Sequence, residues 1–197
     1  MTPEKQLVLT GSQTVGPFFE RALTREDAVR HVLVGPETPG QRVRIHGRLL
    51  DGDGEPVPDG LIEIWQANAH GRYNHPADTR DDLPLDPDFL GFGRCGTDED
   101  GGFWFETVKP GRVPMDGQLQ APHIVVTVFS RGLLNHAVTR LYFADDPSTE
   151  QDPILQRVPP ERRSTLLAQP SGIEGAVTGY QFDIRLQGAG ETAFFNV

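Results

Sequence analysis

The sequence predicts an all-β domain with an antiparallel β-sandwich core, an irregular N-terminal arm and a few short helices. Short apolar or alternating segments recur along the chain, with turn-forming residues between them. The 22 glycines and 17 prolines suit many short strands joined by turns. A chain of 197 residues is long enough for one domain with its own core, so we expect a single domain over residues 1–197.

The expected strands begin at position 43. The segment "VRIHGRLL" alternates polar and apolar residues, the turn residues of "DGDGEPVPDG" follow, and "LIEIWQA" is the next strand. An Asp- and Gly-rich turn in "RCGTDEDGG" then leads into "FWFETV". The remaining expected strands are "HIVVTVFS", "AVTRLYF", "GYQFDIRLQG" and "TAFFNV". Long connections at residues 69–93 and 109–122 separate strands, and loops on a rigid β scaffold commonly carry binding groups.

Two short helices are expected outside this pattern. The arm, residues 1–40, holds one around Glu20–Val32, followed by the Pro- and Gly-rich loop "VGPETPGQ". The segment "PPERRSTLLAQPSG" fits the second, with Pro near its start and a Pro and a Gly after its end.

Charge and composition narrow the classes of partner. The net charge is −10 and no stripe of basic residues is present, which argues against binding to nucleic acid or to an anionic membrane. No run approaches the roughly 18 apolar residues of a membrane span. The N-terminal residues lack the layout of a signal peptide, so we expect a cytoplasmic protein. An anionic substrate would be repelled by the overall charge and would need a local cation.

Two motifs are better explained by structure than by chemistry. The segment "DGDGEPVPDGLIE" superficially resembles a calcium loop, but Pro56 replaces the glycine at its sixth position and Ile62 the glutamate at its twelfth. We interpret it as a turn between strands. Cys95 is the single cysteine, which excludes an internal disulfide, and we interpret it as a small buried apolar residue.

The segment "HGRYNH" contains His70, Tyr73 and His75 directly after the strand that carries Trp65. Tyrosine and histidine together can ligate a metal, and tyrosinate favours ferric iron. A metal site needs three or four ligands that converge from separate elements. The alternative is a polar loop whose histidines lie in solvent.

A second candidate metal ligand begins the segment "QAPHIVVTVFSRG". Side chains alternate along a strand, so positions 123 and 125 share one face. A His-x-His pair there would present two imidazoles to one ion, but position 125 is Val125. His123 is therefore a ligand, the remnant of a ligand pair, or a core histidine.

Two further segments have both a structural and a functional interpretation. "SQTVGPFF", residues 12–19, is either an arm packed on the sandwich or a segment that lines a cleft on a partner chain. Arg131, at the end of the strand that begins with His123, is either a solvated charge or a holder of a substrate carboxylate.

Taken together, "SQTVGPFF", "LIEIWQANAHGRYNH", "GFGRCGTDEDGGFWFETVKPG", "APHIVVTVFSRG", "TRLYF" and "YQFDIRLQGAGETAFFNV" resemble the intradiol ring-cleavage dioxygenases, in particular the alpha chain of a heteromeric member. The resemblance runs from about Gln13 to Val197. It implies a β-sandwich fold and a non-haem ferric ion, bound by two tyrosinates and two histidines, that activates a catecholate toward O2.

The resemblance also implies where this chain departs from the family. Tyr73 matches the tyrosine of the family's Gly-x-Tyr segment, but Val113 stands where the second tyrosine follows Lys-Pro-Gly. His123 matches the first histidine of His-x-His, Val125 replaces the second, and Gln120 replaces an arginine. Valine has no donor atom, so we expect these to be vestigial ligand positions and this chain to bind no metal.

The resemblance then implies that Fe(3+) belongs to a beta subunit in an αβ hetero-oligomer. This chain would complete the substrate pocket, with its arm contacting the partner. Thr14, Gly16 and Pro17 match a Thr-x-Gly-Pro segment that lines the cleft over the partner's iron, and Arg131 matches an arginine near the substrate carboxylate. The substrates would be O2 and a small aromatic anion, a carboxylated catechol.

Two other functions remain open. One is a self-sufficient metalloenzyme that uses His70, Tyr73, His75 and His123. The other is a non-catalytic β-sandwich binding module.

Overall fold

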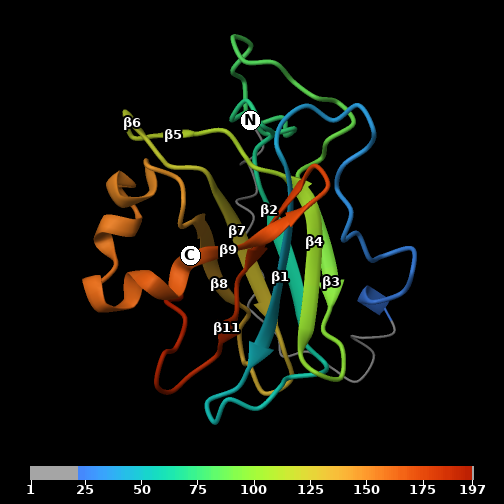
Figure 1. The fold of residues 1–197 in the computed structure, drawn as a ribbon, viewed down its shortest axis with the longest axis vertical. Coiled ribbons are helices and arrows are strands. Elements are labelled where there is room, and N and C mark those ends of the chain that lie inside the picture. The colour runs from blue at the N-terminus through green and yellow to red at the C-terminus, as the bar shows by residue number, and fades with distance from the viewer. Residues whose placement is uncertain (1–21, 197) are drawn as a thin grey trace, which may run out of the picture.

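The computed structural model describes residues 22–196, whose strands pack in two layers with short helices along one side (Figure 1). The strands are β1 (Arg42–Leu50), β2 (Leu61–Trp65), β3 (Phe92–Gly96), β4 (Gly102–Val108), β5 (Pro114–Met115), β6 (Gln118–Leu119), β7 (His123–Phe129), β8 (Ala137–Phe143), β9 (Leu167–Glu174), β10 (Val177–Gln181) and β11 (Ile184–Arg185). The helices are short 3-10 helices, η1 (Thr149–Gln151), η2 (Leu155–Arg157) and η3 (Pro160–Leu166). No helix within the described part of the chain is long and apolar enough to cross a membrane.

The all-β prediction is confirmed, and the sheet is mixed in strand direction. One layer runs β3-β2-β7-β8 with antiparallel pairs, and the other contains β4, β1 and β10. Strand β9 joins them, because its start pairs with β8 and its later part pairs with β10. The pairs β1–β10, β1–β11 and β8–β9 are parallel.

The core lies between the two layers and follows the alternation of the strands. In β1 every second side chain from Val43 to Leu49 is buried, and in β7 the buried series is Ile124, Val126 and Val128. Phe103 and Phe105 of β4 join the same apolar cluster. Full burial of each such side chain contributes roughly 1.5–3 kcal/mol relative to exposure. The odd positions of β7 therefore point away from this core.

The helix predicted around Glu20–Val32 is wrong from position 24 onward. The amides of Ala28 and Val29 both donate to the carbonyl of Arg25, which makes one turn only. The chain then runs along the sheet, where Arg30 bridges to Arg94 and Val32 to Glu106. Pairing with strands satisfies the backbone groups that a helix would have satisfied.

The second predicted helix is present as η3, and its first turn contains a proline. The residues that we placed at its end instead form β9, which the sequence reasoning missed because Pro170 and Gly172 suggested a break. The expected strand "TAFFNV" contributes only a single bridge, between Phe195 and Val138, within the described residues.

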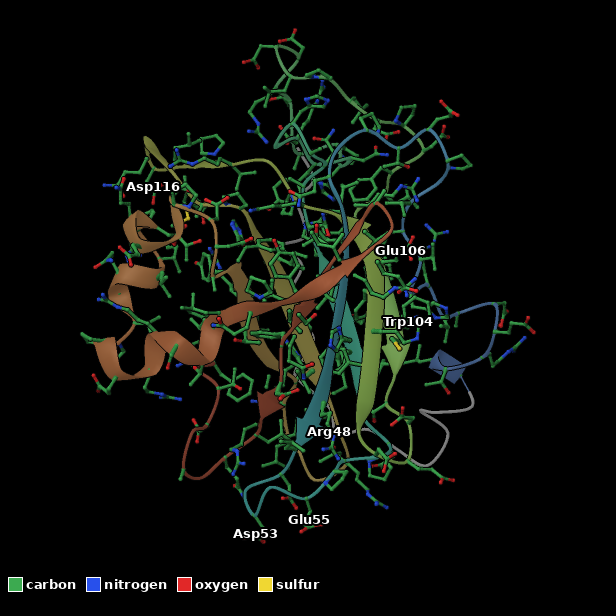
Figure 2. All side chains as sticks on the ribbon, in the orientation of Figure 1. Arg48, Asp53, Glu55, Trp104, Glu106 and Asp116 are labelled. Atoms are coloured by element: carbon green, nitrogen blue, oxygen red, sulfur yellow. The ribbon has the colours of Figure 1, made fainter. Side chains whose placement is uncertain are left out.

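The turn interpretation of "DGDGEPVPDG" is confirmed. The Oδ1 atom of Asp51 accepts hydrogen bonds from the amides of Asp53 and Glu55, both at 2.9 Å. Figure 2 shows Asp53 and Glu55 at the tip of this connection. Cys95 is buried in β3, as expected, and burial raises the pKa of its thiol.

One buried carboxylate joins the helical side of the molecule to the sheet. Asp152 is fully buried between η1 and η2. Its Oδ2 accepts from the amide of Ala121 at 2.8 Å. Its Oδ1 accepts from the Tyr142 hydroxyl and from the amides of Ile154 and Leu155, each at 2.9 Å. This one side chain thus fixes the approach to β7, the end of β8 and the start of η2.

Replacing this carboxylate by an amide should destabilise the fold. In Asp152→Asn one acceptor oxygen becomes a donor, so a buried N–H or O–H loses its partner, at a cost of about 1–3 kcal/mol. Urea denaturation measures the free energy of unfolding. Asp53→Asn, at the exposed turn tip, is the control and should change it by less than about 0.5 kcal/mol. Equal stability of the two variants would contradict this role for Asp152.

Candidate functional site

A cavity of about 560 Å³ lies at the end of the sandwich where β7 begins, and it is lined by all four residues at the positions that the family resemblance implies to be ligand positions: Tyr73, Val113, His123 and Val125. Its walls come from the end of β2, the β2–β3 connection, the segment around β5, and strands β7 and β8. The β2–β3 connection extends beyond the sheet at the top of Figure 1, and the β5–β6 hairpin lies beside it. Segments far apart in sequence therefore meet at one place.

Strand alternation places His123 and Val125 on the cavity side of β7, because Ile124 and Val126 face the core. The Nδ1 atom of His123 lies 2.8 Å from the carbonyl oxygen of Ala121. A carbonyl can only accept, so Nδ1 carries the proton and Nε2 is an acceptor. Burial, and next the charge of Arg140, lowers the pKa of His123 to about 4. The imidazole is therefore neutral near pH 7.

Asn68 holds together the segments that carry Tyr73 and Val113. Its carbonyl accepts from the amides of Gly71 at 3.0 Å and Gly111 at 2.9 Å. Gly71 has φ of 82°, and a Cβ there would meet a backbone carbonyl oxygen at 2.2 Å, so only glycine fits. This close approach holds Tyr73 and Val113 on one wall. The sequence analysis did not single out Asn68. The available signal was a polar residue between an expected strand and a glycine.

Tyr73 is held at its ring and at its backbone amide. Its ring stacks on Trp65, with centroids 5.7 Å apart and planes 12° apart. Its amide donates to Asp78 at 2.8 Å, and Asp78 forms an ion pair with Arg80 at 2.5 Å. Burial raises the pKa of Tyr73, so the phenol is neutral. The Tyr73 hydroxyl has no hydrogen-bond partner among residues 22–196.

The side chains in this cavity do not fit a ferric ion. Val113 and Val125 have no donor atoms, which leaves Tyr73 and His123 at the family positions. Across residues 22–196, no group of three or more His, Cys, Asp or Glu side chains is placed to hold a metal. Ferric sites need the remaining ligands and their supporting partners to complete coordination.

The loop histidines do not complete such a set. His75 lines the cavity, but it is exposed and its Nδ1 accepts from the amide of Ala77 at 3.1 Å. His70 is exposed and lies outside the cavity lining. The solvent-exposed interpretation of the "HGRYNH" histidines is therefore the better one.

Arg140 is a cavity residue that the sequence reasoning missed. It lies on β8 directly opposite Val125 in the β7–β8 register. Its Nη1 donates to the Oε1 of Gln120 at 2.7 Å and approaches the Tyr142 hydroxyl at 3.4 Å. No carboxylate of residues 22–196 lies within ion-pair distance of it. In "AVTRLYF" it looked like an ordinary charged strand residue.

Arg131 lies at the opposite end of the molecule from the cavity. Eight residues separate it from His123, which is roughly 25 Å along an extended chain. Its Nε lies 2.8 Å from Asp59 Oδ2, and 75% of its side chain is exposed. It is therefore not part of the cavity lining. Thr14, Gly16 and Pro17 lie outside the described residues.

Comparisons with known sequences agree with this geometry. A family model described as "Dioxygenase" matches residues 14–188. The chain is 42% identical to the protocatechuate 3,4-dioxygenase alpha chain of Burkholderia cepacia, over the whole of both chains. It is 39% identical to the alpha chain of Pseudomonas putida, covering 98% of this chain and 99% of that one. It is also 39% identical to the Burkholderia cepacia beta chain, covering 92% of this chain and 77% of that one.

Solved structures share the fold. The dioxygenase domain of a carbohydrate-binding fusion protein from Streptomyces sp. SirexAA-E superposes with a TM-score of 0.63 at 26% identity, covering 93% of this chain and 99% of that one. The 3-chlorocatechol 1,2-dioxygenase of Rhodococcus opacus 1CP gives a TM-score of 0.61 at 21% identity, covering 91% of this chain and 69% of that one. The family match over most of the chain and the full-length similarity to alpha chains lead to one conclusion: this chain belongs to the intradiol dioxygenase family.

Proposed function

We propose that this chain is the alpha subunit of a heteromeric protocatechuate 3,4-dioxygenase. The complex would cleave 3,4-dihydroxybenzoate with O2 to 3-carboxy-cis,cis-muconate, with the ferric ion bound by the beta subunit. The observation that carries the proposal is the cavity at the family's ligand positions, which retains one tyrosine and one histidine but has valine at the other two. The similarity to both alpha and beta chains supports a heteromer of related subunits.

In this proposal the chain positions the substrate on its partner. With a net charge of −10 the protein needs a local cation to hold a substrate anion, and Arg131 is an exposed one. The Arg131 side chain is 75% exposed and that of Asp59 33%, and ion pairs that reach solvent contribute only about 0–1 kcal/mol. The guanidinium can therefore exchange Asp59 for a substrate carboxylate at little cost. Thr14, Gly16 and Pro17 of the arm would line the same cleft.

Truncating the Arg131 side chain should selectively impair the turnover of carboxylated substrates. For Arg131→Ala in the reconstituted αβ complex, we expect a loss in kcat/KM for 3,4-dihydroxybenzoate equivalent to about 2–5 kcal/mol. Catechol, which lacks the carboxylate, should be affected much less. Steady-state kinetics with both substrates measure the difference.

Arg48→Ala is the control for this experiment. Arg48 lies at the same end of the sandwich and is also exposed, with Nε donating to the carbonyl of Asp100 at 3.0 Å. Loss of the Arg48 side chain should leave kcat/KM unchanged with both substrates. Unchanged kinetics of Arg131→Ala would favour the non-catalytic binding module instead, and equal losses with both substrates would exclude a contact with the carboxylate.

Iron content should follow the beta subunit. The alpha chain purified alone should contain no stoichiometric iron and show no tyrosinate-to-iron absorption band, because Val113 and Val125 offer no donors. The αβ complex should contain iron equimolar with its beta chain. Metal analysis and visible spectroscopy test both points. Stoichiometric iron with that band in the alpha chain alone would support the self-sufficient metalloenzyme.

We further propose that His123 now serves as a neutral hydrogen-bond donor that fixes the start of β7. Its folded-state pKa of about 4 lies below the ordinary value of 6.5, so the unfolded chain binds more protons between these values. This contribution to stability is complete above the ordinary value and is lost as the pH falls through this interval.

The variant His123→Asn isolates that contribution. Its amide nitrogen can still donate to the carbonyl of Ala121, but it does not titrate. Urea unfolding between about pH 7 and about pH 5 should show a smaller loss of stability in the variant than in the natural chain. Carboxylates that titrate in both proteins cancel in this difference. Identical slopes would exclude a buried neutral imidazole.

A further inference from the structure

We propose that the cavity lined by Tyr73, His123 and Arg140 binds a small hydroxylated aromatic carboxylate, without a metal ion and without converting it. The choice of a hydroxybenzoate as ligand rests on the proposed function. The existence of an anion-binding cavity in this chain rests on the contacts of its own residues.

The charges around the cavity favour an anion. The cavity lining contains two arginines, and Arg80 is neutralised by Asp78 at 2.5 Å. Among residues 22–196, the hydrogen-bond partners of Arg140 are neutral: Gln120 and the Tyr142 hydroxyl. A half-buried guanidinium with no carboxylate partner in the described part of the chain, in a protein of net charge −10, attracts an anion.

The size and walls of the cavity suit a small aromatic molecule. A volume of about 560 Å³ falls within the usual range for small-molecule sites, about 300–1,000 Å³. The stacked rings of Trp65 and Tyr73 supply a flat wall, and Val113 and Val125 supply apolar surface. Mostly apolar walls with a few directed polar groups are typical of sites for small organic ligands. A planar aromatic ring suits such walls better than an inorganic anion does.

Two polar atoms beside the apolar wall can bind a ring hydroxyl. Nε2 of His123 is an acceptor, because Nδ1 carries the proton toward the carbonyl of Ala121. Neither this atom nor the Tyr73 hydroxyl has a hydrogen-bond partner among residues 22–196. A ring hydroxyl can donate to His123 and accept from Tyr73, while a carboxylate on the same ring meets Arg140.

Calorimetric titration of the full chain with 4-hydroxybenzoate, in the presence of an iron chelator, tests the proposal. This probe has a single ring hydroxyl and so cannot chelate a metal as a catechol does. We expect saturable one-to-one binding, and binding at least about tenfold weaker in Arg140→Gln, since truncating a buried charge contact costs that much or more. Arg48→Gln, far from the cavity, should bind like the natural chain. No saturable binding by the folded chain, or equal affinity of the two variants, would overturn the proposal.

A second variant keeps the test decisive if Arg140→Gln does not fold. Tyr73→Phe retains the ring that stacks on Trp65 and removes only the hydroxyl. It should lose most of the preference for 4-hydroxybenzoate over benzoate while binding benzoate normally. An unchanged preference would show that the hydroxyl group is not bound in this cavity.

Failure of the cavity proposal can be distinguished from failure of the proposed function. An active αβ complex whose alpha chain does not bind 4-hydroxybenzoate would overturn the cavity proposal alone. A chain that binds the probe through Arg140, but forms no active complex with a beta chain, would support the cavity proposal and overturn the proposed function.

Discussion

The alternation of side chains along β7 is the constraint on which both the core and the cavity depend. Ile124 and Val126 pack between the sheets, whereas His123 and Val125 point to the opposite side and line the cavity. A one-residue shift in register would exchange the two sets, so burial of the core fixes the cavity. A change from histidine to valine at position 125 removes a metal donor without altering any core contact. Side chains on the cavity face of β7 can therefore change independently of those in the core.

The cavity keeps its shape for a second reason, which is independent of any metal. The carbonyl of Asn68 accepts from both Gly71 and Gly111, and these bonds hold the two loop segments against each other. The side-chain oxygen of Asn68 accepts two more hydrogen bonds, from the amides of His70 and Arg72. Because these contacts are made by backbone groups, they do not require a tyrosine at position 113. The two loop segments are thus held together whether or not position 113 carries a metal donor.

Features of this fold that depend on local sequence patterns were predictable, and features that depend on contacts between distant segments were not. The strands and the turn at Asp51 were predicted because alternation and turn chemistry are local patterns, and resemblance to the family placed Tyr73 and His123. Arg140 was missed because its position depends on cross-strand register opposite Val125. Strand β9 was missed because partners on both layers override the Pro and Gly within it. The helix expected at Glu20–Val32 is absent from position 24 onward because edge pairing with the sheet satisfies the same backbone groups.

Arg131 and Arg140 lie in different electrostatic environments. Arg131 is largely exposed, so its attraction for an anion is screened by salt over a Debye length of about 8 Å at physiological ionic strength. Arg140 is half-buried beside apolar walls, where screening is weaker. A guanidinium beside Tyr73 and His123 can hold an anion, but it has no open coordination position through which to bind a catecholate or O2. In the proposed function, such a cavity would bind carboxylates without ring-cleavage chemistry, and that chemistry would reside on the partner chain.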